Sequence, residues 1–295
     1  MRIHHFISSL VLVVLLTGSS VYGKVMPVEF DLGRNRLIAA MLRSQLSAQH
    51  FGHRSFDEQM SRKAYKLYLN QLDPKKQFLL ASDVAQLDQF ADKIDDEISN
   101  GHISLPDVGM KLLNKRVKKV DALIKEVMAA GFSPNKKDYF QTDSDKLAPA
   151  VDRAELKDRW RRSLKMEVLE SYLDTVDKEN KKREKEGKSL LDAASEEIHQ
   201  ELWAEARKTV QKKTDAYLER LLKVTRQEHY NRYFDAVARS FDPHTNYMAP
   251  TSKEDFDIHM SGSLEGIGAL LREEDGHIKV VRIIPGSAAE AQGQL

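Results

Sequence analysis

From Lys24 to about Arg239, apolar residues recur every three or four positions. This is the period of amphipathic helices, so the pattern predicts a mainly α-helical region. No repeat of twenty to fifty residues is evident, which argues against a solenoid. The predicted stripes run from Met60 to Leu72, Leu87 to Ile98, Val108 to Val127, Leu156 to Val176, and Ile198 to Val237. The first begins at the capping box Ser55/Glu58 and stops at Asp73-Pro74. The second begins at a cap at Ser82 or Asp83 and ends at Asn100-Gly101, and the third ends at Gly131.

Two segments interrupt these stripes. Residues 132–150 hold Pro134, Pro149 and several Asp, Asn and Ser residues, which predicts an extended connection between two helical layers. Residues 177–188 are a mixed-charge stretch that cannot bury apolar surface, and we expect either a solvated helix end or a mobile loop.

The pattern changes at Phe241. Asp242-Pro243 and then Pro250 predict a stiff corner, because proline fixes one backbone dihedral and restricts the residue before it. A short helix is predicted for residues 252–260. Thereafter the alternation is that of strands, with a hairpin at Glu274-Asp275-Gly276 and a final short helix opened by Ser287 with Glu290 three positions later.

Composition narrows the possible functions. The chain of 295 residues carries 46 Lys plus Arg against 45 Asp plus Glu, so its net charge of +1 gives no general attraction to nucleic acid or to anionic membranes. It has no cysteine, which excludes disulfides, thiolate zinc sites and a cysteine nucleophile. No cofactor and no metal site is predicted, since the sequence lacks a His-Glu-x-x-His motif.

The first 23 residues form a separate unit. Arg2 and two histidines precede an apolar run from Phe6 to Leu16, and small residues follow up to Gly23. This order is typical of a cleaved secretory signal, and the run is short for a membrane span. An uncleaved anchor is the alternative. In either case we expect the remainder to face an extracytoplasmic space, without an integral membrane span once the signal is removed.

The strongest candidate site is the sequence Gly266-Ile267-Gly268-Ala269 with the following Leu270. Glycines on both sides of Ile267 allow neighbouring backbone N–H groups to converge, and such a concavity can hold a carboxylate. The predicted ligands are the N–H groups of Ile267, Gly268 and Ala269, with Ile267 or Leu270 lining an apolar pocket. A glycine pair at a strand start can also simply relieve crowding or form a bulge.

Three segments together carry a family resemblance: Ser240-Phe-Asp-Pro-His-Thr-Asn-Tyr, Ser263-Leu-Glu-Gly-Ile-Gly-Ala, and Ile284-Pro-Gly-Ser-Ala-Ala-Glu. They resemble the tail-specific, or carboxy-terminal processing, proteases of the bacterial periplasm. The resemblance implies a signal peptide at 1–23, a helical N-terminal domain at 24–250, and the start of a PDZ domain at 251–295. It also implies a serine nucleophile with a lysine base beyond residue 295, so no catalytic residue is assigned here.

The resemblance implies a periplasmic serine endopeptidase whose PDZ domain captures nonpolar protein C-termini. This chain would contribute recognition of the tail, with an adaptor as a further possible partner of the helical domain, and would be inactive alone. The alternative is a non-catalytic secreted helical adaptor or chaperone that binds C-terminal tails.

Other conspicuous residues are expected to be structural. His244 is predicted to hydrogen-bond locally at the corner, and a role as a metal ligand is the weaker alternative. The aromatic residues Trp160, Trp203, Tyr230 and Tyr233 lie at helical spacing and are predicted to pack in the core.

Overall fold

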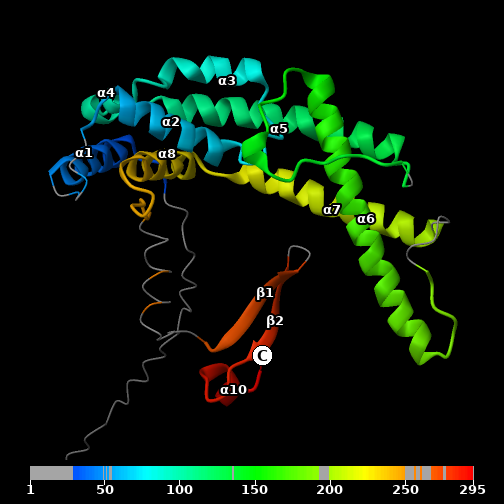
Figure 1. The fold of residues 1–295 in the computed structure, drawn as a ribbon. Coiled ribbons are helices and arrows are strands. Elements are labelled where there is room, and N and C mark those ends of the chain that lie inside the picture. The colour runs from blue at the N-terminus through cyan, green and yellow to red at the C-terminus, as the bar shows by residue number, and fades with distance from the viewer. Residues whose placement is uncertain are drawn as a thin grey trace, which may run out of the picture.

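A computed structural model of the protein describes residues 29–48, 50, 52, 55–134, 136–192, 199–249, 256, 260, 267–274 and 277–294. The predicted signal peptide therefore lies outside the described residues, as does most of the helix expected at 252–260. As predicted, the chain is mainly helical and ends in a small hairpin with a short helix (Figure 1). The larger helices are α1 Leu32–Ala48, α2 Glu58–Leu72, α5 Leu105–Ala130, α6 Arg153–Lys185, α7 Gln200–Lys223 and α8 Arg226–Phe241.

The centre of the helical region is built from α2, α5 and α8. Helix α2 packs against α8, and α5 contacts α8, α7 and α6, so that α5 connects the two ends of the region. Tyr230, Tyr233 and Phe234 of α8 are fully buried there, as expected for aromatics at helical spacing. Phe234 makes ring contacts with both tyrosines and with Tyr247 beyond the helix.

The stripe from Leu87 to Ile98 was expected to form one helix, and this prediction is wrong. The structure has three short pieces, α3 Ala81–Leu87, the 3-10 turn η1 Asp88–Phe90, and α4 Ile94–Asn100. The Ser61 hydroxyl from α2 accepts a hydrogen bond from the Asp95 N–H at 2.8 Å, which satisfies a free donor of α4 and lets a new helix begin. This contact comes from a distant part of the chain and has no local sequence pattern.

The helix ends follow the expected chemistry with small shifts. The predicted cap of α2 at Ser55 is corrected to Asp57, whose carboxylate accepts from the Met60 N–H at 2.8 Å. Of the two caps proposed for α3, Asp83 contributes by accepting from the Leu80 N–H at 2.9 Å. Gly101 and Gly131 close α4 and α5 with φ of 67° and 74°, a left-handed region that glycine adopts freely.

The connection at residues 132–150 is extended as predicted, apart from the 3-10 turn η2 Ser144–Lys146. It is fastened to α6 by Asp138, which forms ion pairs with Arg161 and Lys165. Of the two structures expected at residues 177–188, the helix end is the observed one, since α6 continues to Lys185.

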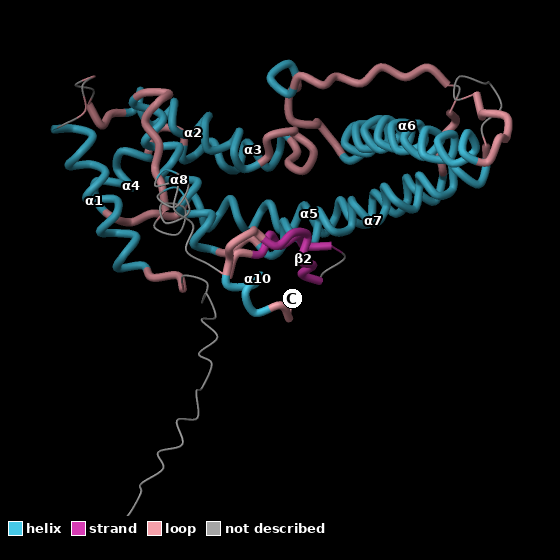
Figure 2. Tube along the Cα trace, turned by 90° about the horizontal axis from the view of Figure 1, so that it is seen from below, coloured by secondary structure: helices cyan, strands magenta, loops and turns pink. Residues whose placement is uncertain are grey.

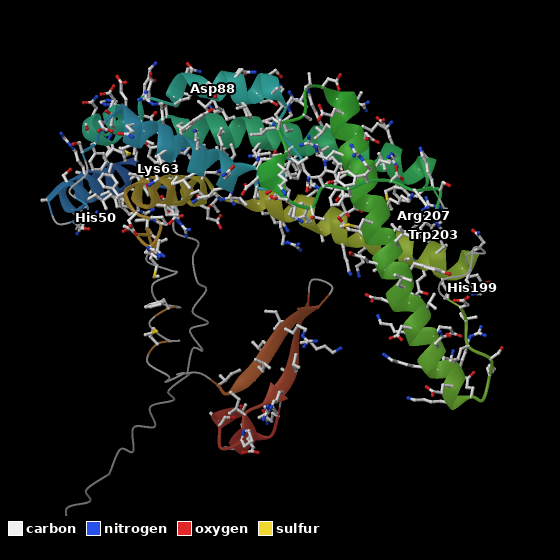
Figure 3. The ribbon with its side chains drawn as sticks, in the orientation of Figure 1. His50, Lys63, Asp88, His199, Trp203 and Arg207 are labelled. Atoms are coloured by element: carbon white, nitrogen blue, oxygen red, sulfur yellow. The ribbon has the colours of Figure 1, made fainter. Side chains whose placement is uncertain are left out.

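Helices α6 and α7 pack side by side and extend away from the centre as an arm (Figure 2). The rings of Tyr172 and Trp203 meet edge to face at 5.7 Å and fill the arm's interior, and Trp160 is buried nearer its base. The side-chain view in Figure 3 shows Trp203 and Arg207 on α7, and the guanidinium of Arg207 donates to the Met128 carbonyl of α5 at 2.5 Å. None of the helices in the described residues is long and apolar enough to cross a membrane.

The last helical stripe was treated as one region, and the structure divides it between α7 and α8. Val224 has an extended ψ of 122°, and Thr225 opens α8 with a capping box to Glu228. The box has the Thr-x-x-Glu spacing, so the break had a sequence pattern that the apolar periodicity concealed.

The hairpin consists of β1 Ala269–Glu274 and β2 His277–Ile283, followed by helix α10 Ala288–Gln292. The strands pair antiparallel, with Glu274 opposite His277, which confirms the predicted hairpin. The register shifts between Leu270 and Leu271, where Val281 is an extra residue on β2.

Candidate functional site

The loop before β1 is held against the start of α10. Gly268 has φ of +78°, and a Cβ atom there would collide with the Ser287 side chain and lie 3.4 Å from its Cα. The Ile284 N–H donates to the Gly268 carbonyl at 2.7 Å, and the Ala289 N–H donates to the Ile267 carbonyl at 2.9 Å. Conformation and crowding therefore both require glycine at position 268.

These two hydrogen bonds fix the direction of the neighbouring N–H groups. In a trans peptide the N–H points opposite to the preceding carbonyl, and the described residues contain no cis peptide. The Ala269 N–H therefore points away from β2, toward the free edge of β1. The Gly268 N–H likewise points away from α10 and has no acceptor among the described residues. Gly266 lies outside those residues, so its predicted part in the site has no structural description.

The strand register divides the hairpin's side chains between two faces. Ala269 lies opposite Ile283, Leu271 opposite Val280, and Glu273 opposite Ile278. Because side chains alternate along a strand, the apolar members of these pairs share one face. We call Ala269, Leu271, Ile278, Val280 and Ile283 the apolar face.

Leu270 lies on the other face, opposite Arg282. Of the two residues predicted to line an apolar pocket, Ile267 or Leu270, the register thus places Leu270 on the face opposite to that of Leu271. Both Ile267 and Leu271 are about half exposed and available to a ligand.

Ser287 has two roles, of which the sequence showed one. Its hydroxyl caps α10 by accepting from the Glu290 N–H at 3.3 Å, as the spacing predicted. The same hydroxyl lies 3.3 Å from the Gly268 carbonyl and donates to it. Glu290 accepts from the Gly286 N–H at 2.6 Å, so the return bond of the box falls one residue earlier than expected.

The corner after α8 is a local hydrogen-bonded turn. His244 Nδ1 lies 3.0 Å from the Asp242 carboxylate, and the His244 N–H donates to the same oxygen, which lowers the pKa of Asp242. His50 approaches from the end of α1 and lies 3.1 Å from the Thr245 hydroxyl. Among the described residues, no group of three or more His, Asp or Glu side chains is placed to hold a metal ion.

The helical region contains a buried polar cluster that sequence reasoning missed. Glu97 accepts from the N–H groups of Ser104 and Leu105 at the start of α5, and burial raises the pKa of its carboxyl group. The Tyr233 hydroxyl is buried beside the Glu97 carboxyl group, whereas the Tyr68 hydroxyl and both ring nitrogens of His229 are buried without a hydrogen-bond partner in the described residues. Desolvation lowers the pKa of His229 to about 4.

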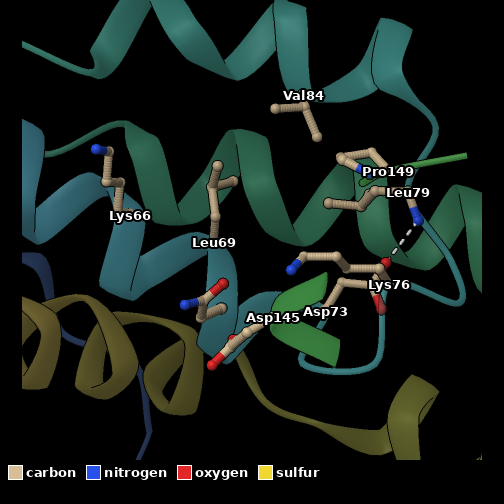
Figure 4. A pocket seen from close by; sticks show the side chains of 9 residues that line it. Lys66, Leu69, Asp73, Lys76, Leu79, Val84, Asp145 and Pro149 are labelled. Atoms are coloured by element: carbon tan, nitrogen blue, oxygen red, sulfur yellow. Dashed lines mark hydrogen bonds between the residues drawn. The ribbon is translucent and has the colours of Figure 1, made fainter. Parts of the chain in front are cut away.

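A pocket of about 380 Å³ lies between α2, α3 and the loop that follows α2 (Figure 4). Its apolar lining comes from Leu69, Leu79, Val84 and Pro149, with lysine and aspartate side chains around them. The buried Asp73 carboxylate accepts hydrogen bonds from three backbone N–H groups of the loop. It therefore stabilises the loop and is not available to a ligand.

Comparisons with known proteins define the class. Residues 42–251 match the tail-specific protease N-terminal domain, and because the match covers most of the chain, the protein belongs to this family. The chain is 25% identical over 257 residues to a tail-specific protease of Haemophilus influenzae, covering 85% of this chain and 33% of that protein. It is 46% identical over 52 residues to the carboxy-terminal processing protease CtpA of Bacillus subtilis, covering 18% of this chain and 11% of that protein. The chain thus spans about a third of the longer-matching relative's length.

Proposed function

We propose that this chain is the N-terminal and substrate-recognition part of a periplasmic serine endopeptidase that captures nonpolar protein C-termini. In this proposal residues 1–23 are a secretory signal, 24–250 the helical domain, and 251–295 the beginning of a PDZ domain. The observation that carries the recognition role is the loop at Gly268. The hydrogen bonds to the Ile267 and Gly268 carbonyls leave the N–H groups of Gly268 and Ala269 directed outward beside the open edge of β1.

A peptide tail fits this arrangement in two ways. Its terminal carboxylate accepts hydrogen bonds from the outward N–H groups, and each such charge-assisted hydrogen bond contributes about 1.5–3 kcal/mol. Its backbone then continues along β1 as an added strand, with the last side chain toward Ile267 and Leu271. Burying that side chain adds about 1.5–3 kcal/mol, which favours nonpolar tails without selecting one protein.

The apolar face of the hairpin supports the assignment to a larger domain. Ile278 is 74% exposed, and Leu271 and Val280 are also open to solvent. A two-stranded hairpin with one short helix needs further strands to cover such a face. We propose that the remainder of a PDZ domain supplies them, and that cleavage by a serine and a lysine takes place in a separate catalytic part.

The test compares a peptide ending in a nonpolar residue with its C-terminal amide, using fluorescence anisotropy. We expect the free carboxylate to bind at least about tenfold more tightly, since one lost charge-assisted bond exceeds 1.4 kcal/mol. Gly268→Ala is expected to abolish this preference. Gly286→Ala is the matched control, because Gly286 also has positive φ, +80°, but no atom within 4 Å of its added Cβ.

Two outcomes would count against the proposal. Equal binding of the acid and the amide would exclude carboxylate capture. Peptide-bond hydrolysis by a purified protein of residues 24–295 would show that catalysis does not need a further domain. A non-catalytic adaptor is the competing function, and it predicts tail binding without any associated protease activity in the full-length gene product.

A further inference from the structure

The helical region has another hollow, of about 390 Å³, between α5 and the beginning of α6. It lies where two loops meet, since Leu80 forms a backbone bridge with Ala150. Its floor is apolar and consists of side chains that are at most 8% exposed, namely Leu80, Val120, Leu123 and Leu156. Ligand pockets span about 300–1,000 Å³, so this hollow is suited to a nonpolar group of side-chain size. We call it the α5–α6 hollow.

The rim of the α5–α6 hollow is cationic. Arg116 and Lys119 line it from α5, and Arg153 lines it from α6. We call these three residues the cationic rim. None of the described residues that line the hollow is acidic. The pocket of Figure 4 differs in this respect, because its lysines are mixed with Asp73 and Asp145.

Two of the rim cations have ion-pair partners that leave some of their donors unused. Arg116 contacts Asp83 through Nε and Nη2, and Arg153 contacts Glu126 through Nη2. Nη1 of each guanidinium has no acceptor among the described residues. Lys119 is exposed and has no ion-pair partner in that part of the chain. Three cations therefore face two carboxylates, and a positive charge with unused donors remains at the rim.

The acidic residue next to the rim in sequence does not cancel this charge. Asp152 precedes Arg153 and is the N-cap of α6, where its carboxylate accepts from the Glu155 N–H at 2.9 Å. Its charge thus lies at the positive end of the helix dipole. A hollow with apolar walls and charge of one sign concentrates the electric field, which attracts an anionic ligand.

The arrangement of floor and rim determines the shape of the ligand. Cations approach from α5 and from α6, and the apolar floor includes residues of both helices. Carboxylates on both sides of a nonpolar group match this order, and guanidinium donors are well suited to carboxylate oxygens. A free aliphatic acid carries one carboxylate at one end, whereas a polypeptide can place acidic side chains on both sides of a nonpolar one.

We infer that the α5–α6 hollow docks a segment of a partner protein in which acidic residues flank a nonpolar side chain. The nonpolar side chain lies on the floor, and the flanking carboxylates lie against the cationic rim. This site is separate from the Gly268 loop, and it recognises internal side chains rather than a C-terminus.

The test uses fluorescent peptides with an acetylated N-terminus and an amidated C-terminus, so that no terminal carboxylate is present. One peptide has a leucine flanked on both sides by glutamates, the second has glutamines in place of the glutamates, and the third has serine in place of the leucine. Anisotropy is measured with the full-length gene product that contains this chain. Each lost ion pair should weaken binding about 1.5- to 5-fold, and loss of the leucine should weaken it at least about tenfold. The first effect should vanish at 1 M salt, where the Debye length is about 3 Å.

Variants assign binding to the hollow. Lys119→Gln should weaken binding of the glutamate peptide about 1.5- to 5-fold and leave the glutamine peptide unchanged. Lys118→Gln is the matched control, because this neighbouring lysine lines a different hollow with Leu218 of α7. Ala122 is exposed and lines the α5–α6 hollow, so Ala122→Trp should fill the hollow and abolish binding. Ala129→Trp, at another exposed alanine of α5, controls for the added indole.

Three results would overturn the inference. The first is equal binding of the glutamate and glutamine peptides, and the second is an equal effect of Lys119→Gln and Lys118→Gln. The third is binding of decanoate without binding of any peptide, which would assign the hollow to free aliphatic acids. The comparison of acid and amide tails at the Gly268 loop uses other peptides and another region, so a failure there leaves this inference intact.

Discussion

The helical region and the hairpin differ in where their stability comes from. In the helical region, large side chains such as Phe234 and Leu113 are buried by other helices of the same region. In the hairpin and α10, the apolar face is exposed to solvent. Ala289 is the only buried residue among those described there. The first region therefore has its own apolar core, whereas the described part of the second is held by local hydrogen bonds. A substitution should consequently affect folding in one region and recognition in the other.

The largest expected contrast comes from removing an apolar side chain in each region. Phe234→Ala should lower the free energy of unfolding by about 3–5 kcal/mol, because it leaves a cavity among three aromatic rings. Ile278→Ala should change it by less than about 0.5 kcal/mol, because that side chain is 74% exposed. Urea unfolding followed by far-ultraviolet circular dichroism measures both. Similar losses from the two variants would show that the regions share one core.

The second prediction concerns acid stability of the helical region. The pKa of His229 is lowered to about 4 in the folded protein, against about 6.5 when unfolded. The unfolded state thus binds more protons between these values, and stability falls as the pH falls from 6.5 to 4. The loss is up to about 3 kcal/mol from this residue. Desolvation is the main cause, and the charge of Arg232 adds to it.

His229→Leu should remove this part of the acid dependence, since neither ring nitrogen has a hydrogen-bond partner to lose in the described residues. The raised pKa of Glu97 acts with the opposite sign, so the measured quantity is the difference between the variant and the unmodified protein. His102→Leu is the control, because His102 is exposed and its ring hydrogen-bonds the backbone carbonyl of Asn100 rather than a carboxylate. An unchanged acid limb in His229→Leu would contradict the assignment.

A third contrast uses Gly109, which lies in α5 against Tyr68. A Cβ at position 109 would overlap the Tyr68 hydroxyl and come within 3.3 Å of Leu72. Overpacking costs about 1–3 kcal/mol, although alanine recovers up to about 1 kcal/mol of helix propensity. Gly109→Ala should therefore destabilise the helical region by about 1–2 kcal/mol. Adding Tyr68→Phe removes the overlapping hydroxyl and should restore most of the loss, and failure of this rescue would show that the ring carbon Cζ at 3.1 Å or Leu72 causes it.

Sequence reasoning was most successful where one local rule determined the structure. The helical class, the glycine ends at Gly101 and Gly131, and the hairpin all follow from periodicity or from backbone preferences. It failed between Leu87 and Ile98, where the Ser61 hydroxyl from another helix starts α4. A contact between segments distant in sequence has no local pattern, so the helix stripe alone could not reveal the break.

The candidate site shows the same limit on a smaller scale. The glycine motif pointed to the loop, but the placement of Leu270 and Leu271 on opposite faces depends on the strand register. The second role of Ser287, its bond to the Gly268 carbonyl, required the spatial approach of α10 to the loop.

The smallest expected effects separate stability from recognition most cleanly, because they use the same chemical change in both regions. Thr225 and Ser287 each cap a helix with a hydroxyl that accepts from the N–H of a glutamate three residues later. Replacing either by alanine costs its helix about 0.5–2 kcal/mol of stability.

Thr225→Ala should lower the unfolding free energy of the helical region by about that amount and leave tail affinity unchanged. Ser287→Ala should leave that unfolding transition unchanged and weaken tail binding a few-fold, because it also removes a hydrogen bond to the loop that carries the outward N–H groups. Peptide titration and urea unfolding on both variants give four values, and a loss of tail affinity in Thr225→Ala would show that the helical region contributes to recognition as well.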